Sequence, residues 1–162
     1  MTGTARFAES APAAAALRAS GLRVAVAESC TGGLLGAALT DIPGASTYML
    51  GGVIAYSDAT KQALLDVPAQ LLATEGAVSE AVARAMASGV RSRLGADLAA
   101  AITGVAGPGH EGTDKPPGLI FVAVLGPAGE ARVIRLDEDR GRAANRAGAV
   151  RTALRLLTEA AS

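Results

Sequence analysis

Apolar residues along the chain gather in short continuous runs that alternate with segments of helical composition. The runs at 22–28, 47–56 and 97–103 are typical of strands buried on both faces. Helices are predicted at 7–19, 32–41, 58–65 and 79–94, with a further short helical piece after Pro68. The segment 79–94 has the clearest signal, because Ser79 can cap its start and apolar residues recur on one of its faces.

The pattern changes in the C-terminal third. Two apolar segments at 119–125 and 131–136 flank the turn Gly126-Pro127-Ala128-Gly129 and predict an antiparallel hairpin. An Ala- and Arg-rich helix is predicted from Asp139 onward. Strands interleaved with helices, followed by a hairpin, indicate the α/β class, here a three-layer α/β/α sandwich with a mixed sheet. No linker interrupts the pattern, so we expect residues 1–162 to form a single domain.

Composition limits the class of protein. Half of the residues are apolar but only four are Phe or Tyr and none is Trp, so Ala, Val, Leu and Ile must build the core. Lys plus Arg and Asp plus Glu number 15 each, which gives no basic footprint for nucleic acid. No apolar run reaches the ~18 residues of a membrane span, and no signal peptide is apparent, so we expect a cytoplasmic protein without a membrane partner. One Cys and one His make a zinc site unexpected, and no metal or cofactor is predicted.

The turn Ala27-Glu28-Ser29-Cys30-Thr31-Gly32-Gly33 joins a predicted strand to a helix. It offers three candidate nucleophiles, and the amides around Thr31-Gly32-Gly33 can donate to a developing oxyanion at the helix N-terminus. An equally consistent interpretation is an ordinary capped helix, with Ser29 or Thr31 as the N-cap. Cys30 is expected to be a small buried residue rather than the nucleophile, since His110 is its only possible imidazole partner.

A lysine is the best available base in a chain with one histidine. Lys61 follows Tyr56 at the start of a predicted helix, and burial would lower the pKa of its amine enough for general-base chemistry. The alternative is a solvated lysine, which is the commoner case. The sequence leaves Glu28 open as a support for the nucleophile, a partner of the lysine or an exposed residue.

Two glycine-containing segments complete the candidate chemistry. The loop Thr103–Gly109 follows a predicted strand, where backbone N–H groups can hold an anion, although a structural turn would look the same. Its spacing fits neither a Walker A motif nor the dinucleotide fingerprint. The pair Gly51-Gly52 inside a strand marks a bulge or the close approach of a backbone or ligand.

Taken together and in this order, these segments resemble one family closely. They are Ala27–Gly33, Gly51–Ser57 with Lys61, Gly76–Ser79, Ala101–Gly109 and Lys115–Gly118. This combination is similar to the CinA C-terminal domain family, the nicotinamide-nucleotide amidohydrolases. The resemblance covers roughly residues 10–158, and we expect a stand-alone domain without the N-terminal domain of larger members.

The resemblance implies hydrolysis of the carboxamide of nicotinamide mononucleotide to nicotinate mononucleotide and ammonia in NAD salvage. It also implies a homo-oligomer, as a dimer or a larger assembly. Ser29 matches the nucleophile, and Lys61 with Tyr56 matches the base system. The implied substrate-binding residues are Cys30, Thr31, Gly32, Gly33, Gly52, Thr103, Gly104, Gly107 and Arg140.

Two segments depart from the family pattern. The loop 109–114 is more charged than the glycine-rich form of the family, and residues 137–146 match its basic stretch only loosely. Arg140 and Arg146 are therefore both candidates for the substrate's phosphate. The alternative function is a nucleotide-binding or regulatory module that has the same pocket and no turnover.

Overall fold

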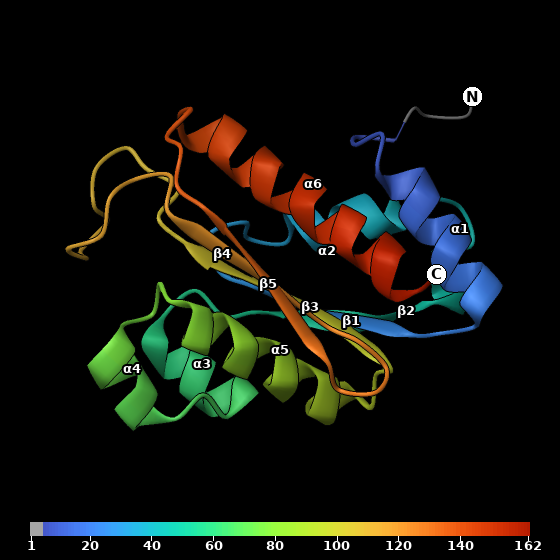
Figure 1. Ribbon diagram of the computed structural model, residues 1–162, viewed down its shortest axis with the longest axis horizontal. Helices are drawn as coiled ribbons and strands as arrows, with labels where there is room; N and C mark the ends of the chain where they lie inside the picture. The colour runs from blue at the N-terminus through green and yellow to red at the C-terminus, as the bar shows by residue number, and fades with distance from the viewer. Residues whose placement is uncertain (1–4) are drawn as a thin grey trace.

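A five-stranded mixed sheet lies at the centre of the molecule, in the order β2-β1-β3-β4-β5 (Figure 1). The structure is a computed structural model that describes residues 5–162. The strands are β1 (Val24–Glu28), β2 (Met49–Ile54), β3 (Leu98–Gly104), β4 (Ile120–Leu125) and β5 (Ala131–Leu136). Strands β1, β2 and β3 are parallel, whereas β4 and β5 form the predicted antiparallel hairpin.

Helices cover both faces of this sheet, so the predicted α/β/α sandwich with a mixed sheet is confirmed (Figure 1). One layer contains α1 (Ser10–Ser20), α2 (Leu34–Thr40) and α6 (Arg142–Ala160). The other contains α3 (Asp58–Leu65), α4 (Ala69–Glu75) and α5 (Glu80–Leu94). A short 3₁₀ turn, Ala45–Thr47, precedes β2. No helix within residues 5–162 is long and apolar enough to cross a membrane.

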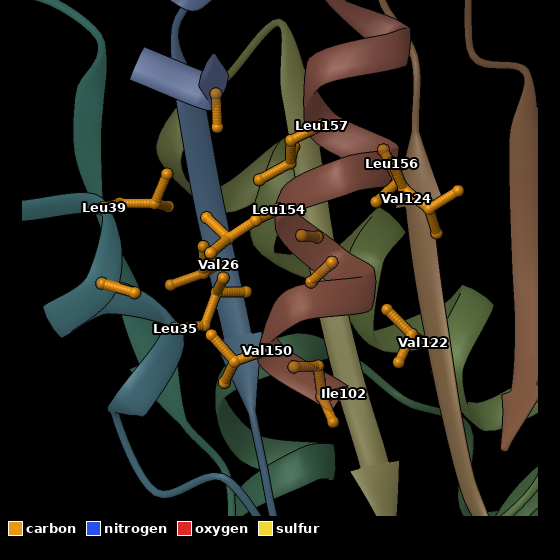
Figure 2. Close-up of a cluster of buried hydrophobic side chains, with 14 of the residues drawn as sticks. Val26, Leu35, Leu39, Ile102, Val122, Val124, Val150, Leu154, Leu156 and Leu157 are labelled. Atoms are coloured by element: carbon orange, nitrogen blue, oxygen red, sulfur yellow. The ribbon is translucent and has the colours of Figure 1, made fainter. Parts of the chain in front are cut away.

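The two faces of the central strands carry side chains of different size. Toward α6, β1 and β3 present Val26 and Ile102, which meet Val150 and Leu154 (Figure 2). Toward α5 the buried apolar residues of the same strands are all alanines, namely Ala25, Ala27, Ala99 and Ala101. Small side chains on this face allow a helix to lie close to the sheet, and α5 fills the space with its own larger residues.

Serine side chains cap the start of two helices, α3 and α5. Ser57 and Ser79 accept hydrogen bonds from the N–H groups of Thr60 and Val82, at 3.1 and 3.2 Å, which confirms the predicted cap at Ser79 and identifies Ser57 as the cap of α3. Helix α2 begins at Leu34, two residues later than predicted, because the backbones of Gly32 and Gly33 adopt φ values of 58° and 100°. These left-handed values suit glycine and do not continue a helix.

Parallel pairing brings the residues that follow three strands to one edge of the sheet. Glu28, at the end of β1, is in register with Ile54 of β2 and with Ile102 of β3. The chain segments beyond these positions therefore meet, as is usual for ligand sites in open α/β sheets.

Two glycines inside helices give opposite predictions for stability. A Cβ at Gly89 of α5 would lie 1.9 Å from the carbonyl oxygen of Leu65, whereas a Cβ at Gly148 of α6 would meet nothing within 4 Å. We expect Gly89→Ala to lower the free energy of unfolding by about 1–3 kcal/mol through overpacking. Gly148→Ala should raise it by about 0.5–1 kcal/mol, because alanine favours the helix. Urea denaturation followed by circular dichroism measures both, and equal effects would contradict the role of packing at Gly89.

Candidate active site

The segments that follow the three parallel strands line one pocket of about 520 Å³. Ser29 and Cys30 come from the end of β1, and Thr103 and Gly104 from the end of β3. The segment after β2 contributes Tyr56, Ser57, Asp58 and Lys61. One further wall is the loop 111–115. The pocket thus contains all three residues expected to perform catalysis, Ser29, Lys61 and Tyr56.

The amine of Lys61 lies against the hydroxyl of Ser29. The distance from Lys61 Nζ to Ser29 Oγ is 3.2 Å, and only 1% of Lys61 and 7% of Ser29 are exposed. Lys61 Nζ also donates to the carbonyl oxygens of Ala55 and Tyr56, at 3.0 and 3.2 Å. Lys61 is therefore not the solvated lysine that the sequence left open.

Burial lowers the pKa of Lys61 from its ordinary value, and the nearby carboxylate of Asp58 opposes the shift in part. A neutral amine has two N–H groups and one lone pair. When the N–H groups are bonded to the carbonyls of Ala55 and Tyr56, the remaining position faces Ser29. The arrangement can therefore accept the Ser29 hydroxyl proton.

Glu28, not Ser29 or Thr31, caps helix α2. Its carboxylate is 1% exposed and accepts hydrogen bonds from the N–H groups of Gly33, Leu35 and Gly36, at 3.1, 3.0 and 2.8 Å. A carboxylate at this place is stabilised by the helix dipole and by charge-assisted hydrogen bonds. The expected cap is corrected accordingly, since neither hydroxyl reaches the helix N–H groups.

The contacts of Glu28 also limit which backbone N–H groups of the turn could donate to an oxyanion. The N–H of Gly33 donates to the carboxylate of Glu28, and the N–H of Gly32 donates to the carbonyl of Ser29 at 3.0 Å. Within the part of the chain that the structure describes, the N–H groups of Cys30 and Thr31 have no acceptor from another residue. Of these two residues only Cys30 lines the pocket, because Thr31 is completely buried.

Arg146 of α6 holds the backbone of this turn. Its Nε donates to the carbonyl of Cys30 at 3.0 Å, and its Nη2 to the carbonyl of Thr31 at 2.9 Å. Cys30 is 3% exposed, and burial raises the pKa of its thiol to about 12. The thiol is therefore protonated at neutral pH and is no nucleophile, in line with its expected role as a small buried residue.

Of the expected binding residues in the two glycine-containing segments, those at the end of β3 lie at the pocket and Gly52 does not. Thr103 lines the pocket and its hydroxyl donates to the carbonyl of Ala77 at 2.8 Å. Gly104 packs tightly on β4, where a Cβ would lie 2.7 Å from Ile120 Cα. Gly52 lies outside this pocket, and its added Cβ would lie 2.9 Å from the carbonyl oxygen of Val26. Its glycine is explained by the close approach of β1.

An arginine that sequence reasoning did not propose for the phosphate, Arg142, contacts two residues that line the pocket, Tyr56 and Glu111. Arg142 Nη1 donates to the carbonyl of Gly107 at 2.7 Å, and Nη2 donates to the Tyr56 hydroxyl at 3.4 Å. Arg142 also forms an ion pair with Glu111. The ring of Tyr56 is 56% exposed, so this residue supports Lys61 through its carbonyl rather than through its hydroxyl.

Arg140 is not brought to this pocket. Its guanidinium lies 2.6 Å from Glu138 and lines a separate cavity of about 460 Å³ beside α6 and β5. Within residues 5–162, no group of three or more His, Cys, Asp or Glu side chains is arranged to hold a metal ion.

Comparison with known proteins agrees with this architecture. The family model described as the CinA C-terminal domain matches residues 8–161. A CinA-like protein of Parasynechococcus marenigrum (strain WH8102) is 57% identical over 131 residues, which are 80% of this chain and 31% of that protein. A CinA-like protein of Mycobacterium avium (strain 104) is 50% identical over 87% of this chain and 34% of its own length. The chain thus spans about a third of the curated relatives it matches.

Solved structures agree as well. The crystal structure of the competence/damage inducible protein CihA from Agrobacterium tumefaciens superimposes with a TM-score of 0.92 at 36% identity, over 99% of both chains. The CinA superfamily protein from Klebsiella pneumoniae 700603 gives a TM-score of 0.88 at 39% identity, over 94% of this chain and 95% of that one. These matches confirm the resemblance inferred from the sequence motifs.

The lowered pKa of Lys61 predicts a pH-dependent stability. The buried amine binds a proton less readily than the same amine in the unfolded chain, so the unfolded state carries more protons between the folded pKa and the ordinary value of 10.5. The stability of the wild type relative to Lys61→Met should therefore rise with pH across that window, by at most about 1.4 kcal/mol per pH unit. Urea denaturation of both proteins across this pH range measures the difference. A difference that does not vary with pH would contradict the lowered pKa.

Proposed function

The chain belongs to the CinA C-terminal domain family, and we propose that it hydrolyses the carboxamide of nicotinamide mononucleotide to nicotinate mononucleotide and ammonia. The observation that carries this proposal is the 3.2 Å contact between Ser29 Oγ and the buried Lys61 Nζ. An amide is a poor electrophile, so its hydrolysis needs an activated nucleophile, stabilisation of the oxyanion and a proton for the leaving nitrogen. The pocket has a candidate group for each of these.

In the first step Ser29 attacks the amide carbonyl carbon while its proton passes to the neutral amine of Lys61. The lone pair of Lys61 faces Ser29 because the carbonyls of Ala55 and Tyr56 take the other two positions of the amine. The resulting ammonium then donates its proton to the amide nitrogen as the C–N bond breaks. Ammonia leaves, and the acyl group stays on Ser29 as an ester.

The tetrahedral intermediate needs donors for its oxyanion. The candidate donor in this turn is the N–H of Cys30, which lines the pocket. Gly32 and Gly33 use their N–H groups within the protein, and Thr31 is completely buried. In other enzymes one such donor contributes roughly 2.7–4 kcal/mol. Water then attacks the ester with Lys61 as base, and the proton taken from water returns to Ser29 as the acid is released.

The phosphate of the substrate requires a cation, and the basic residues near the pocket differ in how many backbone carbonyls they already bind. Arg146 is engaged with the carbonyls of Cys30 and Thr31, and Lys115 with those of Glu75 and Val78. Arg142 binds one backbone carbonyl, that of Gly107, and otherwise contacts the side chains of Tyr56 and Glu111, which line the pocket. We assign the phosphate to Arg142, whose planar fork suits bidentate contact with phosphate oxygens.

A nucleotide-binding module without turnover is the second candidate. It is motivated by the charged loop 109–114, which departs from the family pattern and places Glu111 against Arg142. Release of ammonia from nicotinamide mononucleotide separates the two functions, because only the amidohydrolase produces it.

Ser29→Ala is expected to lower the rate of ammonia release from nicotinamide mononucleotide by at least about a thousandfold, because the nucleophile is lost. Cys30→Ala is the matched control in the next position, and it should retain activity because the buried thiol is protonated. A coupled ammonia assay on both variants measures the effect. Full activity of Ser29→Ala would overturn the nucleophile assignment, and trapping of the acyl group by hydroxylamine would exclude direct attack by water.

Arg142→Gln should raise the KM for nicotinamide mononucleotide by about ten- to a hundredfold, the equivalent of one or two charge-assisted hydrogen bonds. The KM for nicotinamide riboside, which has the same amide and no phosphate, should stay within about twofold because no phosphate contact is lost. Steady-state ammonia release with each substrate measures both. An equal rise for the two substrates would indicate a general disturbance of the pocket and refute the phosphate assignment.

A further inference from the structure

The charges around the pocket are poorly matched to a phosphate. Three carboxylates line it, from Asp58, Glu111 and Asp114. The lining cations are Lys61 and Lys115, but burial lowers the pKa of Lys61, and Lys115 Nζ is held by the carbonyls of Glu75 and Val78. A phosphate dianion entering this pocket would therefore meet more negative than available positive charge.

Glu111, which lines the pocket, forms an ion pair with the guanidinium of Arg142. Arg142 forms an ion pair with Glu111 while it also contacts the carbonyl of Gly107 and the hydroxyl of Tyr56. The carboxylate of Glu111 lines the pocket, so it lies where an anionic group of a ligand could reach the same arginine. A carboxylate offers Arg142 the same kind of planar oxygen pair as a phosphate.

The backbone around Glu111 indicates that this contact holds an unfavourable local conformation. Glu111 has a φ of 48°, in the left-handed region that glutamate rarely adopts. Gly109 and Gly112 on either side have φ values of 74° and 79°, and glycine gives the loop freedom to rearrange there. Across residues 5–162, the Glu111 side chain makes its ion pair with Arg142 alone.

We infer that Glu111 is an internal competitor for the phosphate subsite, and that it sets the preference of this enzyme between phosphorylated and unphosphorylated nicotinamide substrates. The inference rests on the proposed function. A phosphorylated substrate must displace Glu111 from Arg142, whereas a riboside does not need that arginine. Glu111 therefore weakens binding of the phosphorylated substrate only, and displacement frees the loop 109–114 from its unfavourable backbone conformation.

Glu111→Gln tests this, because it keeps the size of the side chain and removes its charge. In the wild type, the apparent affinity for a phosphate is reduced in proportion to the fraction of Arg142 that is free of Glu111. Removal of the competing charge should therefore lower the KM for nicotinamide mononucleotide by about three- to tenfold. The kcat should stay within about twofold because Ser29 and Lys61 are untouched. The KM for nicotinamide riboside should not change. An unchanged or higher KM for the mononucleotide would overturn the inference.

Glu138→Gln is the matched control. It removes one carboxylate from another Glu–Arg ion pair, with Arg140, outside the pocket. It changes the net charge of the chain by the same amount and breaks a similar exposed contact. If Glu138→Gln lowers the KM for the mononucleotide as much as Glu111→Gln does, the effect comes from overall charge and the inference fails.

A binding measurement keeps the inference separate from catalysis. Calorimetric titration of nicotinamide mononucleotide into Ser29→Ala and into Ser29→Ala/Glu111→Gln does not require turnover. Tighter binding by the double variant supports competition by Glu111 even if the wild type releases no ammonia, in which case the proposed function alone fails. Equal binding by the two proteins, or no binding by either, overturns the inference.

Discussion

A lysine amine that is almost entirely removed from water must find polar partners inside the protein, and Lys61 finds three of them. Two are backbone carbonyls of Ala55 and Tyr56, which belong to the segment that leaves β2. The third is the hydroxyl of Ser29, which leaves β1. The contact therefore requires that the two strands lie in parallel register and that α3 starts immediately afterwards, so that the amine can turn back toward the sheet. Burial is unfavourable for an ammonium and favourable for a base, which is why the same feature that weakens the fold equips the site.

The N–H groups at the start of helix α2 are taken by the protein itself, although the helix begins within a few residues of Ser29. Glu28 takes the N–H groups at its start, and this fixes the end of β1 to the helix. The positive end of the helix is thereby neutralised by the protein's own carboxylate. Positive charge near the nucleophile turn comes instead from α6, through Arg142 and Arg146. The positive charge of the site thus comes from side chains that are distant in the sequence rather than from the nearest helix N-terminus.

The order and type of the elements could be predicted from the sequence because each has a local signal. Buried parallel strands appear as continuous apolar runs, and the serine caps lie directly before their helices. The helix cap at Glu28 could not be predicted in this way, since the carboxylate belongs to a residue six positions before the first helical residue, outside the usual cap position.

Site residues could be predicted from the sequence where few side chains are able to do the chemistry. They could not be predicted where their place depends on which face of a helix they occupy. Ser29 and Lys61 stood out because the chain has one histidine and few alternatives. Arg140 and Arg142 look alike in the sequence, but α6 begins at Arg142, so Arg142 and Arg146 are one turn apart on the face toward the site, while Arg140 precedes the helix. The spacing of four residues between Arg142 and Arg146 was the signal that could have found them. The ion pair with Glu111 depends on the conformation of a loop and had no such signal.

The hydrogen bonds from Arg146 to the carbonyls of Cys30 and Thr31 connect residues that are more than a hundred positions apart in the sequence. Contacts of such long sequence separation form late, after the intervening strands have paired. A nascent chain that has emerged as far as β5 already possesses Ser29, Lys61 and the strands that position them, yet the nucleophile turn is still unsupported. Under the proposed function, activity is therefore expected only after the last helix has docked. Its emergence during synthesis would mark the completion of the fold rather than the appearance of the reactive residues.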